Sequence, residues 1–467
     1  MSKDFFYLLP SSTLAEFSDS PPFKGRRLTF PYPFVKPGIE VGDGLFFYYR
    51  KGPASESLLP CKAEVTNINR TANSMTITVD EVFNTSVNSD LVKGILHRMP
   101  EVGHTRLSPD EVNAFLDHMG GIRLEEQDLL SHVKHYITAR GYYFDEETLY
   151  NYHICLKTRP LLILAGLSGT GKSKLSQLYA EALGSSVENG RYLRLAVRPG
   201  WNDDRYLLGY LNTLTGEYMT EPAADFILTA EADYDALYFF CLDEMNLAHV
   251  EYYFSQFLSA LEEEQPSFRR IPLVSERIQR RFQEQGKALD VPPFLCLPSN
   301  LLFTGTINVD ETTQSLSDKV IDRANTIEFF AVDLDKIPER QPGPAPLTIS
   351  AMTWRSYQAR QPDVQYRPQI VEIGKILNEA DLGLGYRVVR EIELYLANSK
   401  NLFTPEVAFD LQVKQRILPR VRGTEAIRGM LDKLIDFTKR AQLPRSEKRL
   451  DEMKFRLKRD GYTSFWR

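Results

Sequence analysis

The sequence predicts an α/β fold built around a parallel sheet, and three observations lead to this prediction. Near-continuous apolar runs occur at LLILAG (161–166), LYFFCLDE (237–244) and LLFTGTIN (301–308), as is typical of parallel strands buried on both faces. Helical patterns lie between these runs, as the connections of a parallel sheet require. The first run also leads into a glycine-rich turn, GLSGTGKS (166–173), followed by a helical pattern.

The chain has 467 residues, which is too many for one ordinary core, and we divide it into four parts. Residues 1–105 are expected to form a β-rich domain, because runs such as SMTITVDEVF (74–83) alternate apolar and polar side chains. Residues 106–150 are expected to be a helical connector, with a helix start at Ser108-Pro109. The α/β core should span 151–338, and a mostly helical region, 339–467, includes the linker RQPGPAP (340–346).

The composition narrows the function classes. A protein that binds nucleic acid mainly through phosphate contacts is usually basic, whereas this chain has a net charge of −6. Any nucleic-acid binding must therefore come from local basic patches. The four cysteines form no CxxC pair, which argues against a zinc site or a disulfide framework. No apolar run approaches the roughly 18 residues of a membrane span. The start, MSKDFFYLLPSS, has too short an apolar segment for a secretory signal. These features favour a cytoplasmic location with no membrane contact.

The segment GLSGTGKS matches the G-x-x-x-x-G-K-[ST] pattern of nucleotide-binding loops. Its glycines let backbone N–H groups turn inward toward phosphate oxygens. Lys172 would supply positive charge to the β and γ phosphates, and Ser173 a hydroxyl to Mg²⁺. We therefore expect a nucleoside triphosphate site formed by Gly166, Ser168, Gly169, Thr170, Gly171, Lys172 and Ser173.

Two carboxylates follow the second apolar run. Asp243 and Glu244 are released at the end of LYFFCLDE, where the carboxyl end of a parallel strand would place them near the phosphate loop. Asp243 is expected to hold Mg²⁺ through water. Glu244 is expected to act as the general base that polarises the water attacking the γ-phosphate.

Several longer segments resemble the McrB-type AAA+ NTPases. They are DEMNLAHVEYYFSQFLSALE (243–262), RPGWNDDRYLLGYLNTLTGEY (198–218), GTINVDETTQSLSDKVIDRA (305–324), GLGYRVVREI (383–392) and DLQVKQRILPRV (410–421). The resemblance covers most of residues 158–425 and implies an AAA+ core with a C-terminal helical lid. It further implies a ring, usually a hexamer, that works with a separate McrC-type nuclease subunit on DNA in anti-phage restriction. GTP is typical of that family, but nothing in this chain specifies guanine, so the substrate is GTP or ATP.

The resemblance also assigns roles to three side chains. Asn308, at the end of LLFTGTIN, takes the sensor position, where a neutral amide can orient the attacking water; an ordinary strand-end turn is the alternative. Arg323 takes the position of an arginine finger that reaches the neighbouring subunit's γ-phosphate. Its alternative is a local salt bridge with Asp322 or Asp318.

Arg387, in GLGYR, is expected to be the lid's sensor, reading the nucleotide of its own subunit. Arg390 is its rival for that role.

Two regions are candidates for contact with DNA or a partner. The segment SFRRIPLVSERIQRRFQEQGK (267–287) is locally basic and could face the pore, DNA or the nuclease subunit, although a solvated helix face is the more common explanation of such a segment. Residues 1–105 resemble the small PUA-like or EVE-like barrels that inspect modified bases. A module that binds single-stranded DNA or docks a protein would look similar.

One other reading uses the same nucleotide motifs. A MoxR-type AAA+ ATPase would remodel a protein client without a nuclease. The DEMNLA and NVDETT contexts favour the McrB-type reading. The chain has no nuclease-like cluster of carboxylates and lysine, so DNA cleavage is expected to lie in another subunit.

Overall fold

The structure is a computed structural model of the chain. It describes six strands within residues 4–106 and then residues 125–466, apart from short gaps at 213–214, 234–235, 264, 285–290, 310–315, 331 and 360. The contacts divide the chain into two compact units, Met1–Glu125 and Glu126–Arg467. The helix start expected at Ser108-Pro109 lies outside the described residues.

The first unit contains a six-stranded sheet in the order β2-β5-β4-β3-β1-β6. Its longest strands, β3 (Gly44–Arg50), β4 (Leu58–Asn69) and β5 (Ser74–Val82), form an antiparallel meander. β5 coincides with the run SMTITVDEVF (74–83), whose alternating side chains predict a strand. β1 (Asp4–Leu8) lies parallel to β3, while β2 (Arg27–Pro31) and β6 (Gly103–Arg106) pair antiparallel with their neighbours.

The second unit is built on a five-stranded sheet in which every pairing is parallel, which confirms the α/β prediction. Its order is β15-β7-β14-β11-β8, so the strand before the phosphate loop lies second from one edge. The strands are β7 (Leu161–Gly166), β8 (Tyr192–Ala196), β11 (Tyr238–Asp243), β14 (Leu301–Asn308) and β15 (Asn325–Phe329). The order is that of a P-loop-like core, and it brings the ends of β7, β14 and β11 side by side.

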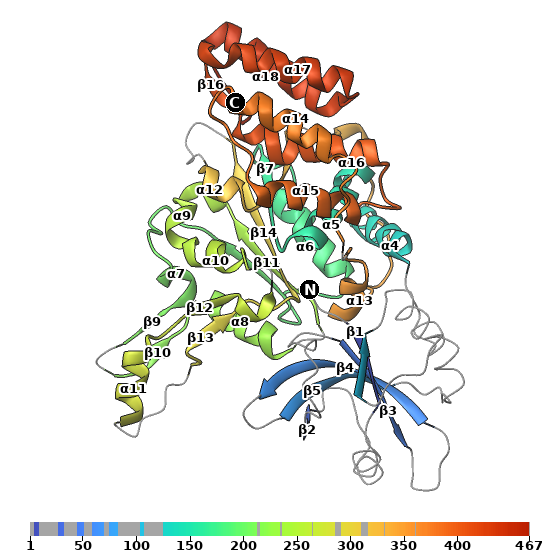
Figure 1. The fold of residues 1–467 in the computed structure, drawn as a ribbon, viewed down its shortest axis with the longest axis vertical. Helices are drawn as coiled ribbons and strands as arrows, with labels where there is room; N and C mark the ends of the chain where they lie inside the picture. Colours follow the sequence, from blue (N-terminus) through green and yellow to red (C-terminus); the bar gives the residue numbers. More distant parts are fainter. Residues whose placement is uncertain are drawn as a thin grey trace. The chain divides into compact units, whose positions relative to one another are not determined.

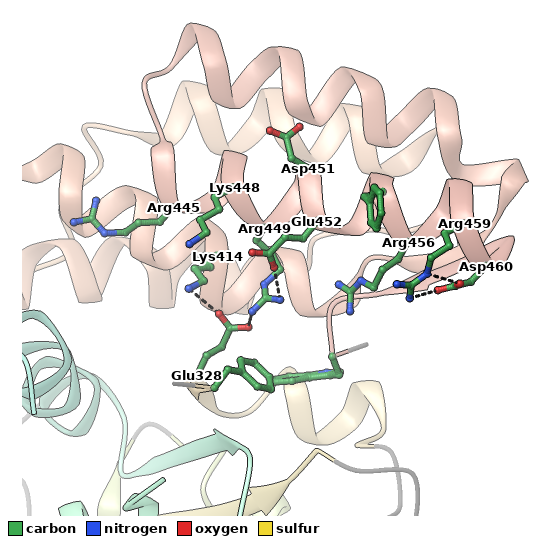
Figure 2. Close-up of a pocket in the computed structure, with 13 residues that line it drawn as sticks. Glu328, Lys414, Arg445, Lys448, Arg449, Asp451, Glu452, Arg456, Arg459 and Asp460 are labelled. Atoms are coloured by element: carbon green, nitrogen blue, oxygen red, sulfur yellow. Dashed lines mark hydrogen bonds and ion pairs between the residues drawn. The ribbon is translucent and has the colours of Figure 1, made fainter. Parts of the chain in front are cut away.

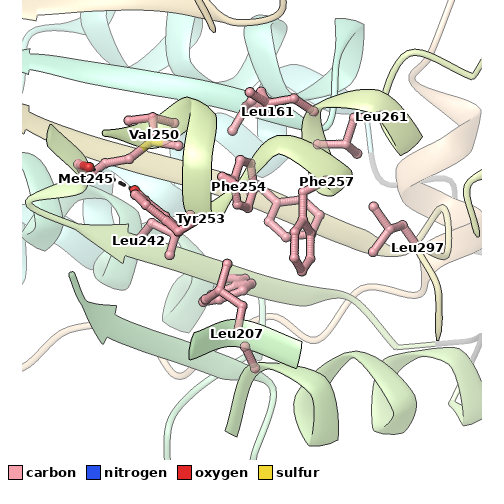
Figure 3. Close-up of a cluster of buried hydrophobic side chains, with 14 of the residues drawn as sticks. Leu161, Leu207, Leu242, Met245, Val250, Tyr253, Phe254, Phe257, Leu261 and Leu297 are labelled. Atoms are coloured by element: carbon pink, nitrogen blue, oxygen red, sulfur yellow. Dashed lines mark hydrogen bonds between the residues drawn. The ribbon is translucent and has the colours of Figure 1, made fainter. Parts of the chain in front are cut away.

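Helices cover both faces of this sheet (Figure 1). On one face, α8 (Pro222–Ala232), α9 (Val250–Tyr253) and α10 (Ser255–Ala260) contribute to a large apolar core with the strands. Figure 3 shows Phe254 and Phe257 stacked within this core, with the Tyr253 hydroxyl bonded to the Met245 carbonyl at 2.8 Å. On the other face lie α5 (Glu146–Thr158) and α6 (Lys172–Ala182), whose Tyr152 and Tyr179 pack edge to face.

Short hairpins extend from the first face. One pairs β9 (Tyr210–Leu211) with β10 (Tyr218–Met219), and the other pairs β12 (Arg270–Pro272) with β13 (Phe294–Cys296). The second hairpin carries α11 (Glu276–Glu284), which Figure 1 shows beside the first hairpin. Residues 267–284 of the basic segment therefore form part of this arm, with α7 (Arg205–Leu208) at its base.

After β15 comes the short 3-10 helix η3 (Leu334–Lys336), and then a linker, 337–349, without helix or strand that crosses the outside of the core. Gln341 N donates to Ala139 O of α4 (Glu126–Ala139), and Leu347 N donates to Ala182 O of α6. The helices after it are α13 (Ala351–Ser356), α14 (Arg367–Asn378), α15 (Tyr386–Asn398), α16 (Pro405–Gln412), α17 (Arg428–Arg440) and α18 (Pro444–Asp460). A small pair, β16 (Arg422–Thr424) and β17 (Tyr462–Ser464), lies at the end of the chain.

A buried polar network joins the core to these C-terminal helices. His153 is fully buried, with its ring nitrogens 2.5 Å from Tyr179 Oη and 2.6 Å from Glu126 Oε1. Lys157 pairs with the same Glu126 oxygen and donates to the carbonyl oxygen of Asn398 at 2.8 Å. Burial lowers the pKa of His153, and the hydrogen bond to Glu126 only partly opposes this effect.

Candidate nucleotide site

The phosphate loop joins β7 to α6 at the carboxyl edge of the sheet. Gly169 and Gly171 have φ values of 79° and 91°, a left-handed conformation that glycine adopts without strain. Gly166 is needed for another reason: a Cβ there would lie 1.9 Å from the Phe329 carbonyl oxygen of β15. The loop is thus wedged against its neighbouring strand and opens onto the first turn of α6, where free N–H groups attract anions.

Lys172 lies across its own loop. Its side chain is buried, and Nζ donates to the carbonyl oxygens of Gly166 at 3.2 Å and Leu167 at 2.5 Å. Burial lowers the pKa of Lys172, and the nearby carboxylates of Asp243 and Glu244 only partly offset this effect. An incoming phosphate would give this ammonium group a fully charged partner in place of two neutral carbonyls.

Asp243 joins the loop to two strands. Its Oδ1 accepts hydrogen bonds from Ser173 Oγ at 2.5 Å and from Thr306 Oγ1 at 2.7 Å. Hydroxyl and carboxylate oxygens are the ligands that Mg²⁺ prefers, and in phosphate-loop sites water and substrate phosphate supply the remainder. Ser173 and Asp243 therefore fit the metal role expected of them. Thr306, in β14, was not among the site residues expected from the sequence. No sequence pattern distinguishes it from the other threonine of the same apolar strand.

Glu244 and Asn308 face each other across neighbouring strands. Asn308 Nδ2 donates to Glu244 Oε1 at 3.1 Å, and Glu244 N donates to Thr306 Oγ1 at 2.9 Å. The Asn246 side chain holds the Asn308 backbone in place: its Nδ2 donates to Asn308 O at 2.8 Å, and its Oδ1 accepts from Asn308 N at 3.2 Å. Glu244 has φ 53° and ψ 46°, a left-handed conformation that is rare outside glycine and often found at functional sites. A carboxylate and an amide are thus aimed together beside the phosphate loop.

An aromatic loop that sequence reasoning missed borders the site. Residues 141–145 connect α4 to α5, and a Cβ placed on Gly171 would lie 3.3 Å from Phe144 Cε1. Phe144 also packs edge to face on Phe329, with ring centroids 6.3 Å apart. Lys174 Nζ lies 5.5 Å from the centroid of the Tyr142 ring. The run GYYF, shortly before a helix, was the sequence signal that could have indicated this loop. Its aromatic rings offer a surface on which a planar base can stack.

The two expected arginines lie at the opposite, amino edge of the sheet. Arg159, just before β7, donates from Nη1 to the Arg323 carbonyl oxygen at 3.4 Å, which fixes Arg323 near the start of the strands. The salt bridge of Arg323 is with Glu262, rather than with Asp322 or Asp318. Arg387 Nη1 bonds the same Glu262 oxygen at 2.8 Å.

Arg387 therefore lies elsewhere than the lid-sensor expectation places it. β7 has six residues, and at about 3.3 Å per residue the two edges of the sheet are about 20 Å apart. An arginine side chain cannot cover that separation, so in this conformation Arg387 does not reach the phosphate loop of its own chain. Arg390, its rival, is exposed on the same helix. Asp310, Glu311 and Thr312 of the NVDETT segment lie outside the described residues.

An open cavity of about 1020 Å³ lies beside α18 and the end of β15 (Figure 2). None of its lining residues belongs to the phosphate loop. Within it, Arg449 and Lys414 both pair with Glu328, and Arg459 bonds its neighbour Asp460. This cavity is distinct from the nucleotide site.

Comparison with known proteins adds little to the functional assignment. A domain of unknown function, DUF8727, matches residues 349–462, the region of the C-terminal helices. No curated protein matches the chain. Among solved structures, the chain is similar to a "putative ATPase" from Cytophaga hutchinsonii ATCC 33406, with 14% identity and a TM-score of 0.38, over 61% of this chain and 79% of that one. Within the described residues, no helix is long and apolar enough to cross a membrane.

Proposed function

We propose that this chain is a Mg²⁺-dependent nucleoside triphosphatase of the AAA+ class. The observation that carries the proposal is the meeting of Lys172, Ser173, Asp243, Glu244 and Asn308 at one edge of the parallel sheet. The loop and the first turn of α6 bind the phosphates. Glu244 takes a proton from the attacking water, and the Asn308 amide orients that water without competing for the proton. Bound Mg²⁺ would supply charge to the β and γ phosphates and be held by Ser173 and Asp243.

We further propose the McrB-type role that the sequence resemblance implies. The chain would assemble into a ring, as a hexamer, and activate a separate McrC-like nuclease subunit on DNA. Two features support a partner-facing arm: Arg277, Arg280 and Arg281 are exposed on α11, and α11 rests on the neighbouring hairpin through Phe282, 3.0 Å from a Cβ built on Gly216. The six-stranded sheet of residues 1–105 is the proposed DNA-recognition module.

Side-by-side hydrolysis assays with GTP and ATP test the enzymatic proposal. With Mg²⁺, the wild type should hydrolyse at least one nucleotide, preferring GTP, and the rate per chain should rise with protein concentration as rings form. Lys172→Ala should abolish hydrolysis and nucleotide binding. Absence of hydrolysis of both nucleotides at ring-forming concentrations, with the nuclease subunit present, would refute the proposal.

The arm is tested by reversing its charge. Arg277→Glu, Arg280→Glu and Arg281→Glu combined should leave basal hydrolysis intact and reduce its stimulation by DNA or the nuclease subunit. Lys433→Glu on α17, whose partner is Glu379, is the matched surface control. Unchanged stimulation of the triple variant would remove the arm from the interface.

A further inference from the structure

The open cavity beside α18, which we call the α18 cavity, takes no part in the proposed nucleotide chemistry. α18 forms one of its walls, and β15 with the residues that follow it forms another (Figure 2). Six of its lining residues are cations, five of them on α18, and four are carboxylates. Three more carry aromatic rings, namely Phe330, Phe455 and Trp466. The cavity thus combines positive charge with flat apolar surfaces.

α18 turns a basic face toward this cavity. Its lining cations recur at helical spacing from Arg445 to Arg459, which at about 1.5 Å per residue extends over about 21 Å. The helix carries seven lysines and arginines against four carboxylates, a formal charge of +3 in a chain whose net charge is −6. Its buried apolar side chains, Leu450, Met453 and Leu457, lie on another side of the helix. α18 is therefore a local basic patch in an acidic chain.

Ion pairs leave part of this charge available to a ligand. Arg459 bonds its neighbour Asp460, with 61% and 45% of the two side chains exposed, and a pair so exposed contributes little to stability. Lys448 is exposed and forms no ion pair with any residue that the structure describes. A phosphate can therefore bind Lys448 and Arg459 without breaking a buried interaction.

Aromatic rings lie among these cations. Phe455 is 64% exposed, and the guanidinium carbon of Arg459 lies 5.7 Å from its ring centroid. Trp466 is partly exposed as well. A positively charged groove with aromatic rings is the kind of surface that binds single-stranded nucleic acid, because cations pair with the phosphates while bases stack on the rings. A duplex hides the faces of its bases, and an acidic peptide has no planar bases to stack, so a single strand fits this surface best.

We propose that the α18 cavity binds a single strand of nucleic acid. Lys448 and Arg459 bind phosphates of the strand, and its bases stack on Phe455 and Trp466. The cavity is separate from the two regions proposed above as contacts with DNA or a partner, residues 1–105 and the α11 arm. No residue of the phosphate loop takes part, so the inference goes beyond the proposed nucleotide hydrolysis and does not depend on it.

Charge reversal on two sides of the same helix tests this site in the full-length protein. Lys448→Glu combined with Arg459→Glu should weaken binding of a fluorescein-labelled oligothymidylate of about 20 nucleotides by about tenfold or more, because two phosphate contacts are lost. Lys454→Glu combined with Lys458→Glu is the matched control, since it changes the net charge equally on α18 but outside the cavity. The control should bind nearly as well as the wild type. Fluorescence anisotropy without nucleoside triphosphate measures both.

Salt dependence and competition sharpen the test. Loss of each phosphate contact should reduce the slope of log K against log salt by about 0.7. The unlabelled strand should compete, whereas a duplex of the same length and poly-glutamate should compete poorly. Equal competition by poly-glutamate would make the partner an acidic protein segment and overturn the inference. Equal weakening of the variant and its control, or no weakening of the variant, would also overturn it, as would absence of binding by the wild type. Each of these results leaves the proposed nucleotide hydrolysis standing.

The two rings give a readout that is independent of charge. Phe455→Ala should weaken binding about fivefold or more, as expected when one stacked base is lost, and Phe455→Tyr should bind like the wild type. The strand should quench tryptophan emission in the wild type but not in Trp466→Phe, because the other two tryptophans, Trp201 and Trp354, are buried. Binding without quenching, together with unchanged affinity of Phe455→Ala, would show that the strand does not enter the α18 cavity.

Discussion

The carboxyl and amino edges of the parallel sheet carry different kinds of side chain. The carboxyl edge holds the phosphate loop with the acidic and amide side chains Asp243, Glu244 and Asn308. The amino edge holds Arg323 and Arg387 on the single carboxylate of Glu262. The side chains of the carboxyl edge suit the nucleotide hydrolysis that we propose. The amino edge carries two guanidinium groups on one carboxylate, and about 20 Å of strand separates the two edges.

In this structure, the arginines of the amino edge therefore do not meet the phosphate loop of their own chain. Each edge is arranged by its own hydrogen bonds, and neither can bend across the rigid sheet to meet the other. In the ring that we propose, the amino edge of one copy would have to approach the carboxyl edge of the next. Substitutions confined to one edge test this difference.

Glu244→Gln removes the general base at the carboxyl edge. Hydrolysis should fall about 10²- to 10⁴-fold, the usual contribution of a positioned base. Nucleotide binding should persist, since the phosphate loop is intact. Glu251→Gln, on α9 outside the site, is the control. Single-turnover hydrolysis and equilibrium nucleotide binding distinguish the two steps, and loss of binding in Glu244→Gln would contradict the assigned role.

Arg416→Met removes a buried guanidinium at the amino edge, which donates to three backbone carbonyl oxygens of residues 321–324 and pairs with Glu391. The change leaves these carbonyls without their donor and deprives Glu391 of one of its partners, so the free energy of unfolding should fall by about 3 to 5 kcal/mol. Arg422→Met offers a matched comparison, because Arg422 pairs at the surface with Asp318 of the same α12 (Asp318–Ile321). That exposed pair should contribute less than about 1 kcal/mol. Denaturant unfolding measures both, and equal losses would show that the buried arginine is not what fixes this edge.

Asn308→Ala removes the amide that faces Glu244. The hydrolysis rate should fall about tenfold to a hundredfold, less than the loss of a full oxyanion donor, since the amide orients water and carries no charge. Nucleotide affinity should be retained. Steady-state kinetics would show a lower kcat at unchanged KM, and a change confined to KM would make Asn308 a binding residue.

Acid should weaken the connection between the core and the C-terminal helices. The folded-state pKa of His153 lies below its ordinary value of 6.5, so below that pH the unfolded chain binds the proton more tightly than the folded chain. Stability should therefore fall as the pH drops from 6.5 toward the folded-state pKa, by at most about 1.4 kcal/mol per pH unit. Burial alone would raise the pKa of Glu126, but its bond to His153 outweighs burial and lowers that pKa. The stability that Glu126 contributes is therefore lost only when the pH falls below 4.5.

Thermal unfolding between pH 7.5 and 5.5 measures this effect. Comparing wild type with His153→Gln separates His153 from the other histidines. A slope that is the same in both would assign the pH dependence elsewhere.

The sequence predicts the carboxyl edge far better than the amino edge, for a physical reason. The runs at 161–166, 237–244 and 301–308 match β7, β11 and β14 to within a residue or two, because strands buried on both faces are apolar throughout. In a parallel sheet the residues after such runs must meet, so Lys172, Asp243 and Asn308 could be placed together without coordinates.

The amino edge depends on packing between distant segments. Glu262 and Arg387 are 125 residues apart, and no local pattern indicates that α15 brings them together. The resemblance supplied Arg387 as a candidate lid sensor, but it could not indicate the pairing with Glu262 that the structure shows. Thr306 and Phe144 escaped notice for a similar reason, since their importance comes from the neighbours that the fold gives them.

The left-handed backbone of Glu244 lowers the stability of the fold at the position of the proposed general base. Such a conformation costs a glutamate about 1 to 2 kcal/mol, whereas asparagine, with its short side chain, adopts it more readily. Glu244→Asn should therefore melt at a higher temperature than the wild type while lacking a base. Selection for stability alone would favour another residue over glutamate at this position. The residue at position 244 should therefore indicate whether a related chain keeps the proposed nucleotide hydrolysis.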